Sequence, residues 1–76
     1  MGEVDAALRS ARAAINAGGG APAHLLAGRA LGKLNQLQDA ERELASAVRL
    51  DPTNAFAAQR LLEIRERMRA AATAPE

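Results

Sequence analysis

The chain has 76 residues, of which 49% are hydrophobic and 25% charged, and its formal net charge at pH 7 is +1. A chain this short forms one domain at most, here residues 1–76, and without cysteine it has no disulfide to stabilise a small core. The balanced charge argues against a dedicated nucleic-acid or membrane binder. Alanine, the best helix former, is abundant, whereas the aromatic residues that strands prefer are limited to one Phe. The composition therefore predicts an all-α domain.

Clusters of turn-forming residues divide the chain into four expected helices. Gly18–Gly20 and Pro22 follow the first, Asn35 and Gln36 follow the second, and the segment 51–54 follows the third. We expect helices at about residues 3–17, 22–34, 37–50 and 55–71, with a frayed tail at 72–76.

Each expected helix carries apolar residues three or four positions apart, which is the spacing of one helix face. These residues are Val4, Leu8, Ala11 and Ile15; Ala27, Leu31 and Leu34; Leu37, Ala40, Leu44, Ala47 and Val48; and Ala57, Leu61, Ile64 and Met68. Gly28 and Gly32 lie inside the second helix, where each costs about 1 kcal/mol relative to Ala. We expect a close packing contact to explain them. On the fourth helix, Glu63 and Arg67 have the spacing of an ion pair.

The first and third expected helices are related by an internal repeat. Ala7 and Ala14 align with Ala40 and Ala47, and both spacings are 33 residues. A second match at constant spacing indicates that the two helices are equivalent members of a helical-hairpin repeat.

The segment 21–54 resembles one complete tetratricopeptide repeat of 34 residues. The residues that carry the resemblance are Gly28, Ala40, Ala47 and Pro52, with Leu31 and Leu44 as apolar residues at aromatic positions. The sequence departs from the family at His24, where a large aromatic is usual, and in its first linker, which has three glycines. The resemblance implies a four-helix, right-handed superhelical array of α-hairpins, about one and a half repeats plus a closing helix.

In this family the first helix of each hairpin lines the concave surface, which here corresponds to the second and fourth helices. The resemblance therefore implies a groove lined by Leu25, Arg29, Lys33, Phe56, Gln59, Arg60 and Glu63. Because Arg binds a carboxylate through two parallel hydrogen bonds, an acidic peptide or a chain terminus is the expected partner. Alternatively, these charges only solvate an exposed face. Phe56 is either a packing residue at a hairpin junction or an exposed binding anchor.

The sequence contains no catalytic or metal-binding motif. The stretch 28–33 lacks the opening Gly and the hydroxyl residue of a phosphate loop, and His24 is the single histidine in a chain without cysteine. We expect a non-catalytic protein–protein interaction module without a cofactor. The alternative is a self-associating structural domain, free-standing or an accessory segment of a larger enzyme or assembly, because repeat arrays usually need about three units for stability.

The N-terminal residues show no basic and apolar signal segment, and no stretch approaches the roughly 20 apolar residues of a membrane span. We therefore expect a cytoplasmic protein. Neither a membrane nor a nucleic acid is an expected partner, because aromatic residues for base stacking are missing and the acidic residues nearly balance the basic ones.

Overall fold

The structure is a computed structural model that describes residues 2–73. It contains the helices α1 (Glu3–Asn16), α2 (Gly20–Lys33), α3 (Leu37–Leu50) and α4 (Ala55–Thr73). No strand occurs in residues 2–73. The prediction of an all-α fold with four helices is confirmed.

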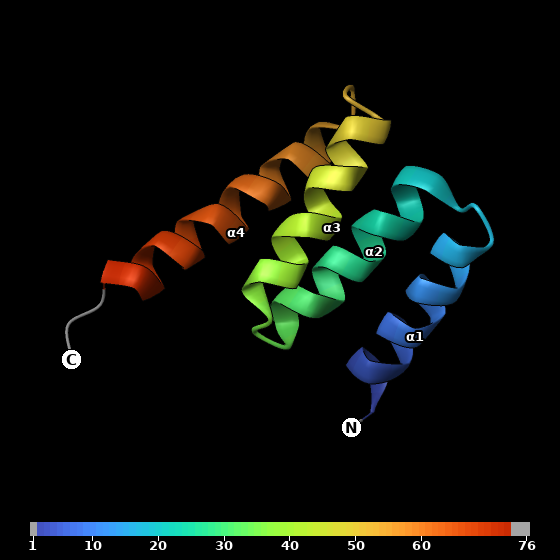
Figure 1. The fold of residues 1–76 in the computed structure, drawn as a ribbon, viewed down its shortest axis with the longest axis horizontal. Helices are drawn as coiled ribbons and strands as arrows, with labels where there is room; N and C mark the ends of the chain where they lie inside the picture. Colours follow the sequence, from blue (N-terminus) through green and yellow to red (C-terminus); the bar gives the residue numbers. More distant parts are fainter. Residues whose placement is uncertain (1, 74–76) are drawn as a thin grey trace.

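The four helices form one staggered layer in chain order, with α1 and α4 at opposite edges (Figure 1). The molecule measures 42 × 32 × 15 Å. Because one helix with its side chains is about 10–12 Å across, the shortest dimension leaves room for a stagger, which lets α2 and α4 touch across α3. Each helix packs on its neighbours in sequence and α2 also approaches α4, whereas over the described range no Cα atom of α1 lies within 8 Å of α3 or α4. This order differs from a closed bundle, in which the first and last helices meet.

The tightest contact joins α2 and α3. Ala40 and Ala47 are 0% exposed, and Leu44 is 1% exposed. A Cβ atom added to Gly28 would lie 2.5 Å from Leu44 Cγ, which is well inside the separation of two non-bonded carbon atoms. A Cβ on Gly32 would lie 3.1 Å from Ile64 Cδ1 of α4. Both glycines therefore have the packing role that the sequence predicted.

The core includes the apolar residues that the helical spacing predicted, together with Ala30 of α2. Leu8 and Ala11 of α1 are buried, and Val4 and Ile15 are partly buried against them. In α4, Ala57, Leu61 and Ile64 are buried and Met68 is partly buried. Hydrophobic burial along these stripes is what joins the four helices.

Helices α1 and α2 end in the same way. Gly18 and Asn35 adopt left-handed conformations, with φ of 84° and 62°. The following amides donate back to the helix, Gly19 to Ala14 O at 2.7 Å and Gln36 to Leu31 O at 2.9 Å. These are Schellman motifs, in which a residue with positive φ lets the last carbonyl groups find donors.

Some boundaries differ from those expected. α1 and α2 each end one residue earlier, and α2 begins at Gly20, which places Pro22 within the first turn, where its missing N–H has no intrahelical partner. α4 continues to Thr73, two residues beyond the expected end of the helix at residue 71. Residues 70–72 are alanines, and Thr73 Oγ1 donates to Arg69 O at 3.0 Å. The expected fraying of residues 74–76 falls outside the described residues.

Replacing Gly28 by Ala should make the protein less stable than the matched Gly32→Ala variant by about 1–3 kcal/mol. Both variants gain the same helix propensity, but at residue 28 the new Cβ overlaps a branched carbon of the buried Leu44, whereas at residue 32 it meets the mobile end of Ile64. Urea unfolding followed by circular dichroism measures the difference. Equal stabilities would contradict the close contact of α2 with α3.

Candidate functional site

A groove runs between α2 and α4, with α3 beneath it. Its lining residues are Gly28, Arg29, Gly32 and Lys33 of α2, Leu44 of α3, and Arg60, Glu63, Ile64 and Arg67 of α4. The two glycines present no side chain to this space. The same residues that allow the helices to pack closely therefore also keep the groove open.

Most of the site residues expected from the sequence come together at this groove. Four of them line it, namely Arg29, Lys33, Arg60 and Glu63. Phe56 and Gln59 adjoin it through contacts with these residues: the Phe56 ring packs against Arg29 and Arg60, and Gln59 Nε2 donates to Glu63 Oε2 at 3.4 Å. Leu25 does not line the groove, because its side chain is partly buried against the core.

Phe56 connects the two walls of the groove. It lies in the first turn of α4 and is 46% exposed. The guanidinium carbon of Arg60 is 4.8 Å from the ring centroid, and that of Arg29, on α2, is 5.7 Å away. Both distances suit a cation–π interaction, which favours a guanidinium above an aromatic face. Phe56 therefore packs at the junction of α2 and α4 while about half of it stays accessible.

The groove has an excess of positive charge. Its lining includes the cations Arg29, Lys33, Arg60 and Arg67 but only one acidic residue, Glu63. Glu63 Oε1 accepts a hydrogen bond from Arg60 Nη1 at 3.2 Å, and since both side chains are well exposed this ion pair is weak. The Nε of Arg60 is buried and has no acceptor in the described chain. An incoming carboxylate would meet positive charge that the protein itself neutralises only in part.

Arg67 was not among the site residues expected from the sequence. Its Nη2 donates to Gly32 O at 3.2 Å and to Asn35 Oδ1 at 3.1 Å, so it connects α4 to the C-terminal end of α2. The expected pair of Glu63 with Arg67 is not formed, because Glu63 turns to Gln59 and Arg60. The signal that could have revealed this contact is the partial negative charge of a helix C-terminus, which attracts cations.

His24 lies outside the groove, between α2 and α3. Its Nδ1 is 2.6 Å from Glu43 Oε1, and both side chains are about three-quarters buried. In the part of the chain that the structure describes, no three His, Cys, Asp or Glu side chains are grouped to hold a metal ion. The contact of His24 with Glu43 joins α2 to α3.

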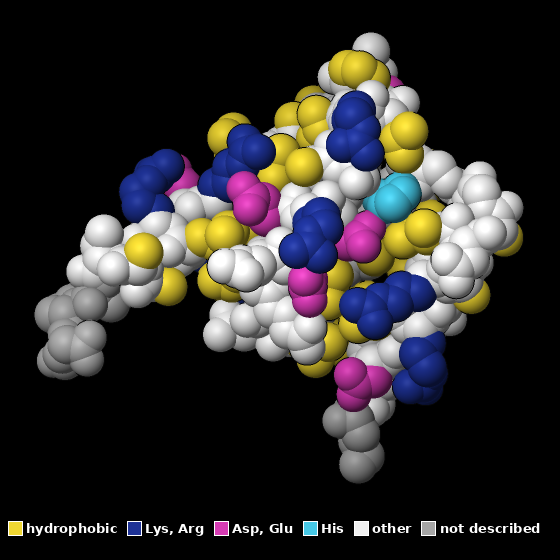
Figure 2. Space-filling view, in the orientation of Figure 1, with side chains coloured by type: hydrophobic (Ala, Val, Ile, Leu, Met, Phe, Trp, Pro, Cys, Tyr) yellow, Lys and Arg dark blue, Asp and Glu magenta, His cyan; other side chains and the backbone are white. Residues whose placement is uncertain are grey.

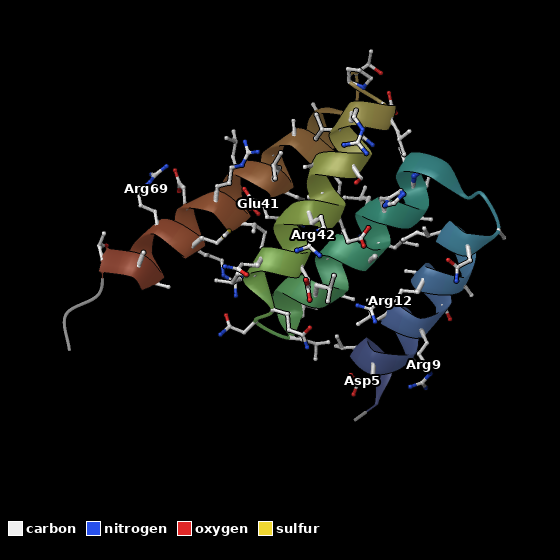
Figure 3. All side chains as sticks on the ribbon, viewed as in Figure 1. Asp5, Arg9, Arg12, Glu41, Arg42 and Arg69 are labelled. Carbon is white, nitrogen blue, oxygen red and sulfur yellow. The ribbon has the colours of Figure 1, made fainter. Side chains whose placement is uncertain are left out.

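One face of the layer carries basic and acidic side chains interspersed (Figure 2). Arg42 pairs with Asp39 at 3.4 Å, and Arg65 of α4 pairs with Glu41 of α3 at 3.1 Å; Figure 3 labels Arg42 and Glu41. Exposed pairs of this kind contribute little to stability. None of the helices within residues 2–73 is both long and apolar enough to cross a membrane.

Comparison of the chain with protein-family models, with curated proteins and with solved structures gave no match. The groove and the internal repeat are therefore the features of the chain that indicate a function.

Replacing Arg67 by Met should loosen the attachment of α4. The variant loses two hydrogen bonds to the end of α2, which should cost about 1 kcal/mol, while the apolar part of the side chain is kept. Hydrogen exchange of the α4 amides should become faster. Arg69→Met is the matched control, because Arg69 is exposed on the same helix (Figure 3). If the two variants exchange alike, Arg67 does not hold α4 in place.

Proposed function

We propose that the chain is a non-catalytic protein-binding module of the tetratricopeptide type, which holds an acidic peptide segment in the groove between α2 and α4. The observation that carries this proposal is a groove lined by four cationic side chains and a single carboxylate, in which two of the guanidinium groups lie over the half-exposed ring of Phe56. Clustered Arg side chains are a recurring means of recognising acidic segments.

The helix arrangement supports the tetratricopeptide part of this proposal. In a hairpin array of this type, the first helices of successive hairpins face each other across the concave surface, and here the corresponding helices, α2 and α4, touch and share the groove. The corresponding second helices, α1 and α3, have no Cα atoms within 8 Å of each other in the described residues. Gly28, Ala40 and Ala47, which carry the resemblance, are all buried, and Gly28 lies against Leu44 and Ala40 of α3.

The chemistry of the lining supports an acidic ligand. A guanidinium offers paired N–H donors that match a carboxylate. In this groove, two guanidinium groups lie against the ring of Phe56, which holds them at the edge of the space that a carboxylate would enter. The exposed part of the ring offers an apolar surface for a neighbouring side chain of the peptide.

The groove is poorly suited to catalysis. Its lining contains no Ser, Thr, Cys or His, so it lacks the hydroxyl, thiol and imidazole groups that most often act as nucleophiles or as general bases. Nucleic acid is also a poor fit, because single-strand binders stack successive bases on several aromatic side chains and this chain has one.

Reversing two groove charges, Arg29→Glu with Arg60→Glu, should weaken binding of an acidic peptide by at least about tenfold, because each lost charged contact is worth about 1–3 kcal/mol. The matched control is Arg9→Glu with Arg12→Glu, which makes the same change in net charge on the exposed side of α1 (Figure 3). Fluorescence anisotropy with a labelled Glu- and Asp-rich octapeptide measures the effect, and its Gln and Asn analogue tests the need for carboxylates. The proposal fails if both double variants bind alike, or if the two peptides do.

Replacing Glu63 by Gln should tighten binding of the same peptide by a few-fold, because Glu63 is the one carboxylate that competes for Arg60. Glu41→Gln removes the same charge outside the groove, where Glu41 pairs with Arg65, and serves as the control. The anisotropy titration applies again, at several salt concentrations. Weaker binding by the Glu63→Gln variant would mean that Glu63 itself contacts the ligand and does not compete with it.

A further inference from the structure

A second groove, between α1 and α2, is built like the first. It is lined by Glu3, Val4 and Ala7 of α1 and by Leu26, Arg29, Ala30 and Lys33 of α2. Adding 34 to the four α2 positions gives Arg60, Glu63, Ile64 and Arg67, which are the four α4 residues that line the α2/α4 groove. In the α2/α4 groove, α2 forms the wall opposite these α4 residues. In the α1/α2 groove, no helix of the described chain forms a wall opposite the equivalent α2 residues.

The α1 surface beside this groove is uncovered where the equivalent α3 surface is buried. Ala40 and Ala47 of α3 are 0% exposed. Ala7 and Ala14, which lie 33 positions earlier, are exposed and partly exposed respectively. Leu26, on the α2 wall, is 53% exposed. The α1/α2 groove can therefore accept one more helix, and we call this surface the seat. The added helix would pack on α1 and α2 in the way that α2 packs on α3 and α4.

We propose that α4 of a second copy occupies this seat, so that chains associate head to tail. α4 forms the free edge of the layer and carries Leu62, which is 61% exposed and lies 34 positions after Gly28. The two ends of the chain are then complementary, since α4 of one copy and α1 of the next complete a hairpin between two chains.

Side-chain sizes at the equivalent positions favour α4 as the occupant. Within one chain, Gly28 meets the large Leu44, and Gly32 meets the large Ile64. In the proposed interface, Leu62 and Glu66 of the second copy take the places of Gly28 and Gly32, because each lies 34 positions later. Leu62 then meets the small Ala11, which is 33 positions before Leu44, and Glu66 meets the small Ala30, which is 34 positions before Ile64. Large and small residues exchange sides in both contacts, so each again pairs one large residue with one small residue.

Charge also favours α4. A Cβ on Gly32 would lie 3.7 Å from Nη1 of Arg67. The equivalent contact between two chains brings Glu66 of the second copy to Lys33, which pairs opposite charges. Glu63 of the second copy follows on the same helix face, toward a wall that carries Arg29 and Lys33. Opposite charges across an interface fix the register of the partners and disfavour other arrangements.

This contact is heterologous, because the surface that one copy offers differs from the surface that it receives. Such a contact grows into an open chain of copies unless its geometry closes a ring. The inference does not rest on acidic-peptide binding, which concerns the α2/α4 groove, although Arg29 and Lys33 line both grooves.

Two blocked variants test the arrangement. Ala7→Arg fills the seat, and Leu62→Arg replaces the apolar side chain of the occupant with a charge that Arg29 and Lys33 repel. Sedimentation from micromolar concentrations to about 1 mM covers the range of modest interfaces. The wild-type mass should rise with concentration beyond two chains, whereas each variant alone should remain a single chain of 7.9 kDa.

An equal mixture of the two variants should form a heterodimer and nothing larger. The Ala7→Arg variant keeps an intact α4, and the Leu62→Arg variant keeps an intact seat, so only one interface can form. Leu50→Arg is the matched control: Leu50 is 53% exposed but lines neither groove, so this variant should associate like the wild type. Circular dichroism verifies that every variant is folded.

Three results would overturn the proposal. The first is a wild-type mass of 7.9 kDa at every concentration. This result overturns the proposal even if the α1/α2 groove binds an added amphipathic peptide. The second is association of a blocked variant with itself, which indicates a symmetric interface. The third is a mixture of folded variants that forms no heterodimer although the wild type associates.

Discussion

The close approach of α2 and α3 at Gly28 determines where the other helices lie. With no side chain at this position, Leu44 of α3 packs directly against the α2 backbone, and Ala40 and Ala47 are fully buried. At this spacing, α4, which packs on α3, also reaches α2, where Gly32 admits Ile64 and Arg67 binds the last turn. A larger residue at Gly28 would separate the walls that α2 and α4 give to the groove.

Packing and the proposed function use the same residues. Gly28 and Gly32 remove side chains from the space between α2 and α4, so the groove is lined mainly by the long cations on either side. Arg29 and Lys33 line both the α2/α4 groove and the α1/α2 groove. An acidic peptide and the acidic residues of α4 from a second copy would therefore draw on the same two cations.

The sequence predicts the four helices well because each apolar stripe repeats with the helical period and each turn contains residues with special backbone preferences, such as Asn35. The grouping of Arg29, Lys33, Arg60 and Glu63 followed from the repeat resemblance. Individual side-chain partners could not be predicted in this way. Arg67 bonds to carbonyl and amide oxygens at the end of α2, and that partner exists only once the helices are packed. Leu25 shares a helix with Arg29 but turns to the core.

Nuclear Overhauser spectroscopy on the methyl-labelled protein tests the close packing of α2 most directly. We expect strong cross-peaks from the Hα protons of Gly28 to the Leu44 methyl groups and from those of Gly32 to the Ile64 δ-methyl group, because both pairs are in van der Waals contact. Gly28 protons without a cross-peak to Leu44 would mean that α2 and α3 are not closely packed, and the α2/α4 groove would then lose its structural basis.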